Sequence, residues 1–561
     1  MHNWILSICS LIFIFSCQSE APYDLIITNA KIYTVNADQE WAEAIAISDG
    51  RIVAIGSQDS IGRKANKIID AKGNFMMPGF IEGHGHFAGM GQMLINLNLL
   101  RSRSWEEIVS QVSKKSKTTS PGEWIEGRGW HQEKWDSIDI RNINGYPYHT
   151  QLSKISPDNP VILYHASGHS LFANEAAMKE AGITKETNPP MGGAIIRDSD
   201  GAAIGVFEER AMNLISNAHR KYEQGLSKDA LENKWYDGIK LAQKECLQKG
   251  ITSFQDAGSK FDELEKYEQL AIDGKLDIRL WAMIRHTHDQ MDGQLEEFKK
   301  QGVGNNFYSC TAIKSELDGA LGSFGAWLLE DYSDKAGFVG QNTTEIEELE
   351  QIAQLAKTNG MQLCIHAIGD RGNRASLDVI EKFTDPTQDH RWRIEHAQHL
   401  HPDDIPRFKS SGTIASMQAI HCTSDAPFVE KRLGLKRSKE GAYAWRSLID
   451  AGAIVTNGTD APVEDVNPIE CFYASVTRKR IDNGFEFFSE QKMTRAEAIA
   501  SYTINNAYAV FQEDIKGSLE VGKVADLVML SKNLIECNDD DILSTEVMMT
   551  MVDGVVKHEK K

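Results

Sequence analysis

Short apolar runs alternate with longer amphipathic stretches along most of this chain. Several of the runs are separated by segments with helical periodicity, such as 345–357 and 442–451. The apolar runs cover residues 75–81, 251–255, 278–284, 310–314, 361–365, 392–394, 413–417 and 453–456. This repeated order of strand and helix predicts an α/β fold, a (β/α)8 TIM-type barrel over residues 75–512. The first run, interrupted by Pro78-Gly79, is expected to be one buried strand that ends in His84 and His86.

The two ends of the chain show a different pattern. Short β runs occupy 24–28, 31–35, 42–48 and 51–55, and further β runs follow at 517–530 and 547–556. Neither end is large enough to form a convincing domain alone. We therefore expect 22–74 and 513–561 to combine into one composite β-sandwich. The excess length lies after the first barrel strand, and it predicts an inserted subdomain over the barrel mouth at about 100–230.

The first residues resemble the signal peptide of a bacterial lipoprotein. An apolar run from Trp4 to Phe15, too short to cross a bilayer as a helix, precedes Cys17. Residues 1–17 would then be the signal peptide, and Cys17 would carry the lipid. Two features depart from that pattern: the first three residues carry no positive charge, and Phe15 is bulky. An uncleaved membrane anchor is the alternative. Either interpretation predicts a location in the cell envelope of a bacterium, and the first predicts a lipid anchor on a membrane.

Composition restricts the classes of partner. The chain has 561 residues and a formal net charge of −20, with no basic stripe to neutralise phosphates, which excludes nucleic acid as a partner. The six cysteines that follow Cys17 are scattered, without Cys-x-x-Cys spacing, which is typical of core thiols and not of a zinc ribbon. The expected partners are a small-molecule substrate, the membrane and a second copy of the chain in a homodimer.

Polar residues follow the ends of several apolar runs, on the face where a barrel of this type carries its active site. Each of these residues alone is more often structural, and His-x-His pairs occur three times in the chain. The joint arrangement predicts one metal centre. Its expected ligands are His84 and His86 on strand one, Lys314 on strand four, His366 on strand five, His396 on strand six and Asp460 after strand eight.

The residue types suit two divalent ions. Neutral imidazole and carboxylate bind zinc, and manganese or iron are alternatives. The ammonium of Lys314 would repel such ions, but carbon dioxide converts it into an anionic carbamate whose oxygens can bridge a metal pair. Two ions can lower the pKa of a shared water, and Asp460 can take its proton and pass it to the leaving nitrogen. Read alone, Asp460 could instead cap a helix.

Several segments resemble the amidohydrolase superfamily, specifically its family-3 branch, which includes N-substituted formamide deformylases. The segments are 80–86, 127–130, 168–174, 189–193, 318–322, 366–371, 393–398, 418–425 and 517–530. The resemblance implies a barrel with a composite sandwich. It also implies His84 and His86 on one metal, His366 and His396 on the other, Lys314 as the carboxylated bridge and Asp460 as the catalytic acid and base.

Two positions depart from the family pattern. His131 stands where the family often has aspartate, which limits any transfer of substrate identity, and Glu82 stands where strand one often carries aspartate. Further candidates for substrate binding are Trp130, His131, His169, Arg371 and His421. The competing interpretations are packing for Trp130, support of a glycine-rich loop for His169, and pairing with Asp370 or Glu395 for Arg371.

The function that follows is hydrolysis of a non-peptide C–N bond in a small N-acyl or N-formyl compound by metal-activated water. A deaminase of the same superfamily, acting on a small cyclic substrate, is the competing enzyme. Such deaminases usually lack a bridging lysine, so Lys314 disfavours this alternative. From a different class, the chain could be a surface-tethered binding lipoprotein without catalysis. The six retained ligand positions argue against that alternative.

Overall fold

The computed structural model describes residues 23–560, except 63, 100, 101, 131, 133, 134, 136–140, 166–169, 192 and 323. The expected signal peptide and Cys17 lie outside these residues, and so do His131 and His169. Within the described part, no helix combines the length and the apolar character that a bilayer crossing requires.

Parallel strands form the centre of the molecule, and they confirm the predicted barrel. In the described residues one sheet has the order β24-β23-β22-β21-β20-β18-β17-β8, with a short strand β19 beside β20. The eight strands are β8 (Phe80–Gly85), β17 (Ile251–Ser259), β18 (Arg279–Ile284), β20 (Tyr308–Glu316), β21 (Gln362–Ala367), β22 (Arg393–His396), β23 (Ile414–Met417) and β24 (Val455–Asn457). Each overlaps one of the predicted runs. The strands are almost entirely buried, which explains why they appear in the sequence as continuous apolar runs.

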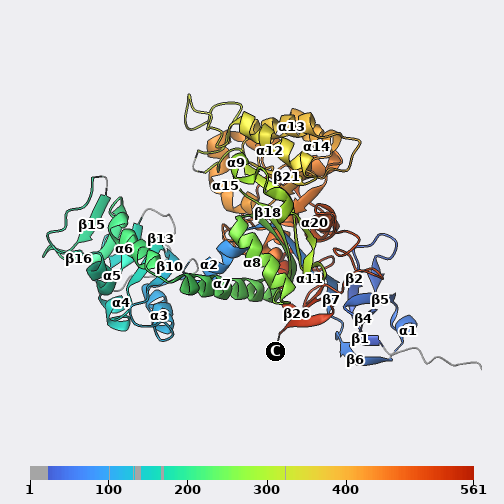
Figure 1. Cartoon of the computed structure of the whole chain (residues 1–561), viewed down its shortest axis with the longest axis horizontal. Helices are drawn as coiled ribbons and strands as arrows, with labels where there is room; N and C mark the ends of the chain where they lie inside the picture. Colours follow the sequence, from blue (N-terminus) through green and yellow to red (C-terminus); the bar gives the residue numbers. More distant parts are fainter. Residues whose placement is uncertain are drawn as a thin grey trace, which may run out of the picture.

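Helices follow the strands and cover the barrel (Figure 1). Their buried faces contribute to the main hydrophobic core, which they share with the outward side chains of the strands. The longer ones are α2 (Phe87–Ile95), α7 (Lys228–Gln248), α8 (Phe261–Ile272), α12 (Ile346–Thr358), α13 (Asp370–Phe383), α14 (Ile405–Ser411), α15 (Ala419–Leu433), α16 (Leu435–Gly441), α17 (Trp445–Asp450), α18 (Pro468–Thr477), α19 (Arg495–Ser501) and α20 (Ile504–Tyr508). The shorter ones are α9 (His288–Met291), α10 (Leu295–Phe298) and α11 (Val303–Asn306).

Close contact between β8 and the segment after β24 brings the two ends of the barrel sheet together. The amide N of Asp460 donates to the carbonyl O of His84 over 2.7 Å, and the amide N of His86 donates to Ala461 O over 2.7 Å. Glycines permit this approach. A Cβ on Gly458 would lie 2.6 Å from His84 N, and a Cβ on Gly83 would lie 2.4 Å from Asn457 O. Closure of the barrel therefore sets the positions of His84, His86 and Asp460 together.

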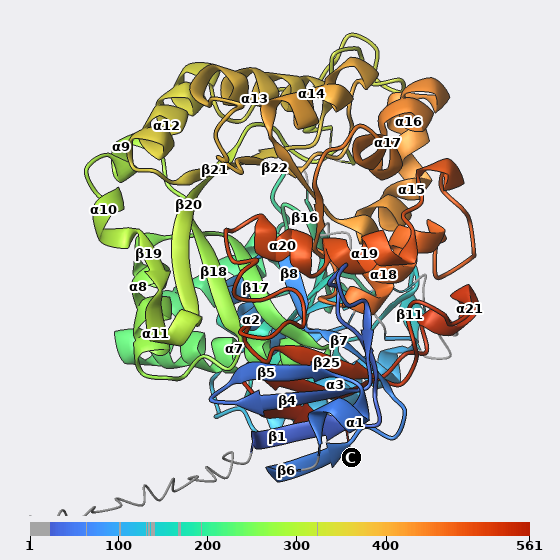
Figure 2. The ribbon, with the colours of Figure 1, turned by 90° about the vertical axis from the view of Figure 1, so that its right-hand side faces the viewer.

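The N- and C-terminal segments form two packed sheets, as predicted (Figure 2). One sheet is N-terminal, with the order β5-β4-β1-β6, and the other combines both ends of the chain in the order β27-β26-β25-β7-β2-β3. Apolar side chains from both sheets pack between them, including Ile27, Ile47, Leu527 and Met551. The strands are β1 (Tyr23–Thr28), β2 (Lys31–Tyr33), β3 (Trp41–Ala42), β4 (Ala44–Ser48), β5 (Arg51–Gly56), β6 (Ala65–Asp70), β7 (Phe75–Pro78), β25 (Leu527–Leu530), β26 (Val547–Val552) and β27 (Val555–Glu559). Short helices α1 (Gln58–Ile61) and α21 (Asp539–Ile542) lie in the same two segments.

The apolar run 75–81, expected to be one strand of the barrel, is divided at Gly79. Its first part, β7, pairs with β2 and β25 in the sandwich, whereas its second part opens the first barrel strand. A Cβ on Gly79 would lie 2.2 Å from the side chain of Thr252 in β17, so the chain passes between the two sheets at a point with no room for a side chain. The expectation of a single strand is therefore wrong. Both parts are buried, so the hydrophobic pattern does not reveal the change of sheet.

The insert after α2 is a separate subdomain with its own hydrophobic cores. Its sheet has the order β15-β16-β14-β13-β10-β9. The strands are β9 (Leu97–Asn98), β10 (Ile125–Trp130), β13 (Val161–His165), β14 (Ser170–Ala173), β15 (Gly193–Arg197) and β16 (Ala203–Glu209), with a small hairpin of β11 (Asn142–Ile143) and β12 (Tyr146–Pro147). The helices are α3 (Trp105–Ser116), α4 (Thr150–Ile155), α5 (Glu175–Glu180) and α6 (Met212–Gln224). Figure 1 shows the insert at the opposite end of the molecule from the sandwich, joined to the barrel through α2 and α7.

Glycines also set the crossing of α2 and α7, which connects the insert to the barrel. A Cβ on Gly91 would lie 2.6 Å from both the carbonyl carbon and the carbonyl oxygen of Gly238. Gly89, in the same helix, is exposed, and its Cβ would make only ordinary contacts from 3.5 Å.

We predict that Gly91→Ala lowers the free energy of unfolding by about 1–3 kcal/mol, because the new methyl group forces the two helix backbones apart. The matched variant Gly89→Ala should raise it by about 0.5–1 kcal/mol, since alanine loses less conformational entropy in a helix. Denaturant unfolding of both variants measures the difference. Equal effects of the two substitutions would contradict the proposed close packing.

Candidate metal centre

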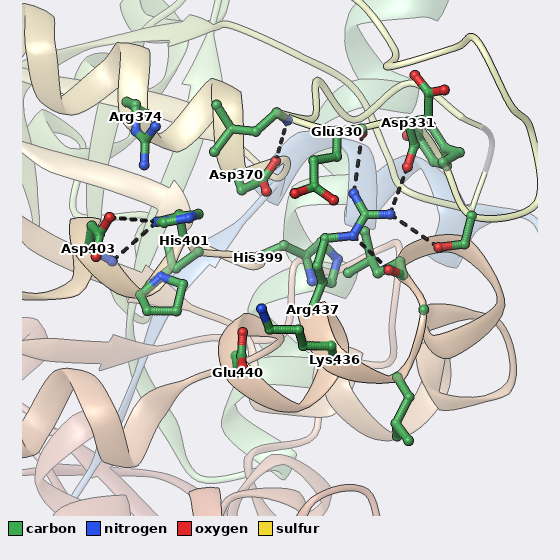
Figure 3. Close-up of a pocket in the computed structure, with 18 of the residues that line it drawn as sticks. Glu330, Asp331, Asp370, Arg374, His399, His401, Asp403, Lys436, Arg437 and Glu440 are labelled. Carbon is green, nitrogen blue, oxygen red and sulfur yellow. Dashed lines mark hydrogen bonds and ion pairs between the residues drawn. The ribbon is translucent and has the colours of Figure 1, made fainter.

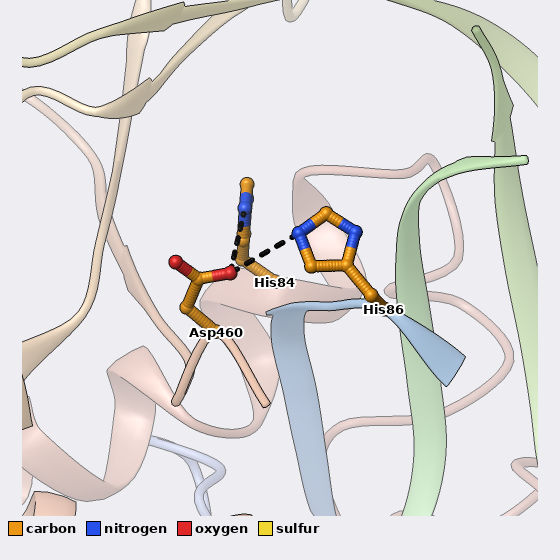
Figure 4. Close-up of side chains that lie close together, drawn as sticks. All are labelled: His84, His86 and Asp460. Atoms are coloured by element: carbon orange, nitrogen blue, oxygen red, sulfur yellow. Dashed lines mark ion pairs between the residues drawn. The ribbon is translucent and has the colours of Figure 1, made fainter. Parts of the chain in front are cut away.

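One carboxylate oxygen faces two imidazoles at the barrel mouth. His84 lies near the end of β8, His86 lies at the N-terminal boundary of α2, and Asp460 follows β24. Asp460 Oδ1 lies 3.6 Å from His84 Nε2 and 3.3 Å from His86 Nε2 (Figure 4). These three side chains form a group whose ligand atoms are close enough to hold one ion.

A second group shares the same aspartate. His396 and His421 form it together with Asp460, and all three are buried. The rings of His396 and His421 are nearly parallel, at 14°, with centroids 6.1 Å apart. His421 was expected only as a substrate contact, but its Nε2 lies 3.9 Å from Asp460 Oδ2, so its imidazole belongs to the cluster.

The remaining expected ligands lie against this cluster. The ring centroid of His396 is 4.4 Å from that of His366 and 4.7 Å from that of His84. In the pairing of β20 with β21, Glu316 is opposite His366. Lys314 precedes Glu316 by two residues, so its side chain points to the same side of β20 as that of Glu316. The structure therefore brings the six expected ligands to the C-terminal ends of the strands.

Lys314 is buried, and it makes no hydrogen bond or ion pair with any described residue. Burial is the main cause that lowers the pKa of His84 to about 4 and that of His366 to about 3, and the charge of Lys314 is the next. Burial also lowers the pKa of Lys314 itself. The two imidazoles are thus neutral near pH 7, which is the form that binds a metal ion.

The cluster leaves several buried polar atoms without a hydrogen-bond partner. They are His84 Nε2, His366 Nε2, His421 Nε2 and Asp460 Oδ1. An unsatisfied buried polar group costs about 1–3 kcal/mol, so four in one place require a further partner. Nitrogen and carboxylate donors that converge in this way fit a divalent ion such as zinc.

Acceptors hold the other ring nitrogen of two of these histidines. His84 Nδ1 contacts Glu395 Oε2, and His396 Nδ1 lies 2.6 Å from Gln418 Oε1. Sequence reasoning considered Glu395 only as a partner of Arg371. The signal that it missed is the pair Arg393 and Glu395 on one buried strand, because buried charges need partners.

Two cluster residues have a left-handed backbone. The φ angles are +72° at His396 and +59° at Asp460. For residues other than glycine this conformation costs about 1–3 kcal/mol, and it persists where the surrounding structure enforces it. The left-handed backbone at these two residues therefore lowers the stability of the folded protein.

Two of the expected substrate contacts have hydrogen-bond partners within the protein. Trp130 is fully buried in the core of the insert, and its indole N–H donates to the carbonyl O of Leu163 over 2.8 Å. Arg371 donates through Nε to Leu328 O and through Nη2 to Leu329 O, over 2.9 and 3.1 Å. Both residues thus hold the protein's own backbone, and their assignment to substrate binding stays a prediction.

A cavity of about 930 Å³ lies between the loops that follow β20 and β22, helix α13 and the α15–α16 segment, and none of the six expected ligands lines it (Figure 3). Its wall includes His399 and His401, a pair left out of the expected ligand set. Arg437 in its wall donates to the carbonyl oxygens of Glu330 and Asp331 over 3.2 and 2.7 Å. This cavity is distinct from the histidine cluster.

Comparisons with known proteins agree with this geometry. A family model described as "Amidohydrolase family" matches residues 67–558. The chain is 31% identical over 549 residues to "Protein LONG AFTER FAR-RED 3" of Arabidopsis thaliana, which covers 95% of this chain and 91% of the relative. It is 26% identical over 558 residues to "N-substituted formamide deformylase" of Arthrobacter pascens, with 96% and 98% covered.

The crystal structure of an uncharacterized metal-dependent hydrolase from Pyrococcus horikoshii OT3 matches with a TM-score of 0.71 and 26% identity, and it covers 92% of this chain and 99% of that one. Family match, barrel and ligand cluster lead to the same conclusion: this chain belongs to the amidohydrolase family and is a metal-dependent hydrolase.

Proposed function

We propose that this enzyme hydrolyses the C–N bond of a small, non-peptide N-acyl or N-formyl compound at a centre of two divalent ions. The observation that carries the proposal is that two groups of buried or half-buried ligands share Asp460: His84 with His86, and His396 with His421. Several Nε2 atoms of this cluster lack hydrogen-bond partners. The similarity to an N-substituted formamide deformylase over nearly the whole chain supports this class of substrate.

The expected ligands would divide into two sets, although the second group that the structure places around Asp460 contains His421 beside His396. His84 and His86 would hold one ion with this carboxylate, and His366 and His396 would hold the other, with zinc the first choice of metal and manganese or iron alternatives. Bound ions of this kind lower the pKa of water and polarise the carbonyl group of a substrate.

Asp460 is suited to move the proton. Burial alone would raise the pKa of Asp460, but its close approach to the imidazoles of His86, His84 and His421 holds it well below its usual range. The side chain is therefore a carboxylate at neutral pH. It can accept a proton from the attacking water and deliver it to the amine nitrogen as the C–N bond breaks.

Lys314 would act as a carbamate. Its neutral Nζ would attack the carbon of carbon dioxide, one N–C bond would form, and one proton would leave to solvent. Burial favours the neutral amine that this reaction needs, because it lowers the pKa of Lys314. The product would place an anion next to the ligand nitrogens, in place of a buried amine that makes no hydrogen bond or ion pair with the described residues.

We predict that Lys314→Met binds fewer metal ions than the wild type and that its metal content no longer depends on bicarbonate. Methionine keeps the length and volume of the side chain but cannot form a carbamate. Elemental analysis after reconstitution with zinc, with and without added bicarbonate, measures both properties. Two ions per chain in Lys314→Met, or no effect of bicarbonate on the wild type, would exclude the carbamate bridge.

We also predict that Asp460→Asn lowers kcat for N-formyl and N-acyl amines by about 10²–10⁴-fold, because the proton acceptor is lost. Asparagine tolerates the left-handed backbone at this position, so the melting temperature serves as the folding control. The wild type should release formate or another carboxylate together with the amine. Release of ammonia from cyclic amidines, with no amide cleavage, would favour the deaminase instead.

A further inference from the structure

Glu395 lies between two donors inside the barrel. Its Oε2 contacts His84 Nδ1, and its Oε1 accepts a hydrogen bond of 2.5 Å from Arg393 Nε. All three side chains are buried at 1% exposure or less. The carboxylate thus uses each of its two oxygens for a different N–H group.

Further contacts of Arg393 hold this arrangement in place. Arg393 Nη1 donates to Gln255 Oε1 over 2.6 Å, and Gln255 Nε2 donates to the carbonyl O of Asn506 over 2.8 Å. The guanidinium also lies over the ring of Trp281, with 5.0 Å to its centroid. Rotation of Glu395 would break contacts on both sides, so its two oxygens have fixed partners.

From this geometry we propose that Glu395 is a positioning residue, which keeps the proton of His84 on Nδ1 and so reserves Nε2 for the ion. The inference rests on the metal centre of the proposed function. An acceptor at Nδ1 decides the tautomer of the ring and its orientation, and a carboxylate in that place also strengthens the other nitrogen as a ligand.

The neighbouring strand shows why the residue is glutamate and not glutamine. Gln418 accepts from His396 Nδ1 through Oε1 and donates through Nε2 to Ser416 O over 3.0 Å, so an amide suits one donor and one acceptor. Glu395 faces two donors. With glutamine at this position the NH2 group would point either at Arg393 Nε–H or at His84 Nδ1, and the second arrangement would move the imidazole proton to Nε2.

The test is zinc affinity, measured by competition with a chromophoric chelator and without substrate. Glu395→Gln should weaken the tighter zinc site about 10–100-fold, the usual effect of removing a group that orients a ligand. The matched control is Asp404→Asn, which removes a buried carboxylate paired with Arg374 and Arg407 but in contact with no histidine. Unchanged affinity in Glu395→Gln, or an equal loss in Asp404→Asn, would overturn the proposal.

A second variant separates orientation from general stability. In Arg393→Met/Glu395→Gln the competing donor is gone, so the amide oxygen can turn to His84 Nδ1 and part of the lost zinc affinity should return. A merely structural role predicts a further loss. The double variant buries no unpaired arginine, so it remains informative if Glu395→Gln does not fold. Zinc affinity within about tenfold of the wild type supports the proposal, and any larger loss overturns it.

The two proposals fail separately. Zinc affinity is measured on the protein alone, so a wild type that binds zinc tightly but cleaves no amide would reject the substrate class and leave the role of Glu395 intact.

Discussion

Closure of the barrel between β8 and the segment after β24 is the constraint on which the site depends. Two backbone hydrogen bonds join these segments, and glycines at 83 and 458 allow them to approach. The same contact sets His84 and His86 beside Asp460, although these residues come from opposite ends of the barrel sequence. Any change that widens this junction would separate the shared carboxylate from its imidazoles before it affected the rest of the core.

Burial gives the cluster its chemical character. Imidazoles far from water stay neutral, and a lysine in the same place becomes a weaker base, so the site holds uncharged nitrogen donors in a low-dielectric environment. Burial would raise the pKa of Asp460 and of Glu395. The imidazoles around Asp460 and the guanidinium of Arg393 beside Glu395 instead lower these pKa values well below the usual range, so both side chains are carboxylates. A cation placed between such groups gains favourable interactions that solvent does not screen.

The sequence was sufficient to predict the barrel and the strand ends at which the expected ligands lie, because both depend on local patterns. Buried strands appear as apolar runs, and the polar residue that ends a run lies at the carboxyl edge. The division at Gly79 could not be predicted, since both strands it separates are buried and apolar. Trp130 shows another limit: aromatic composition does not distinguish a core residue from the wall of a pocket, and only its bond to Leu163 does. Glu395 was overlooked because one of its two partners, His84, comes from a strand far away in the sequence.

The division of one apolar run between sandwich and barrel also has a consequence for the order of synthesis. β7 directly precedes the first barrel strand, and it pairs with β25. This partner exists only after the ribosome has translated residues 527–530. Until then one edge of β7 has no partner strand, and the position of the chain at Gly79, where β8 begins, is not fixed. The expected ligands at the end of β8 are thus translated early but reach their final positions late. The nascent chain must protect an exposed apolar strand for most of its synthesis.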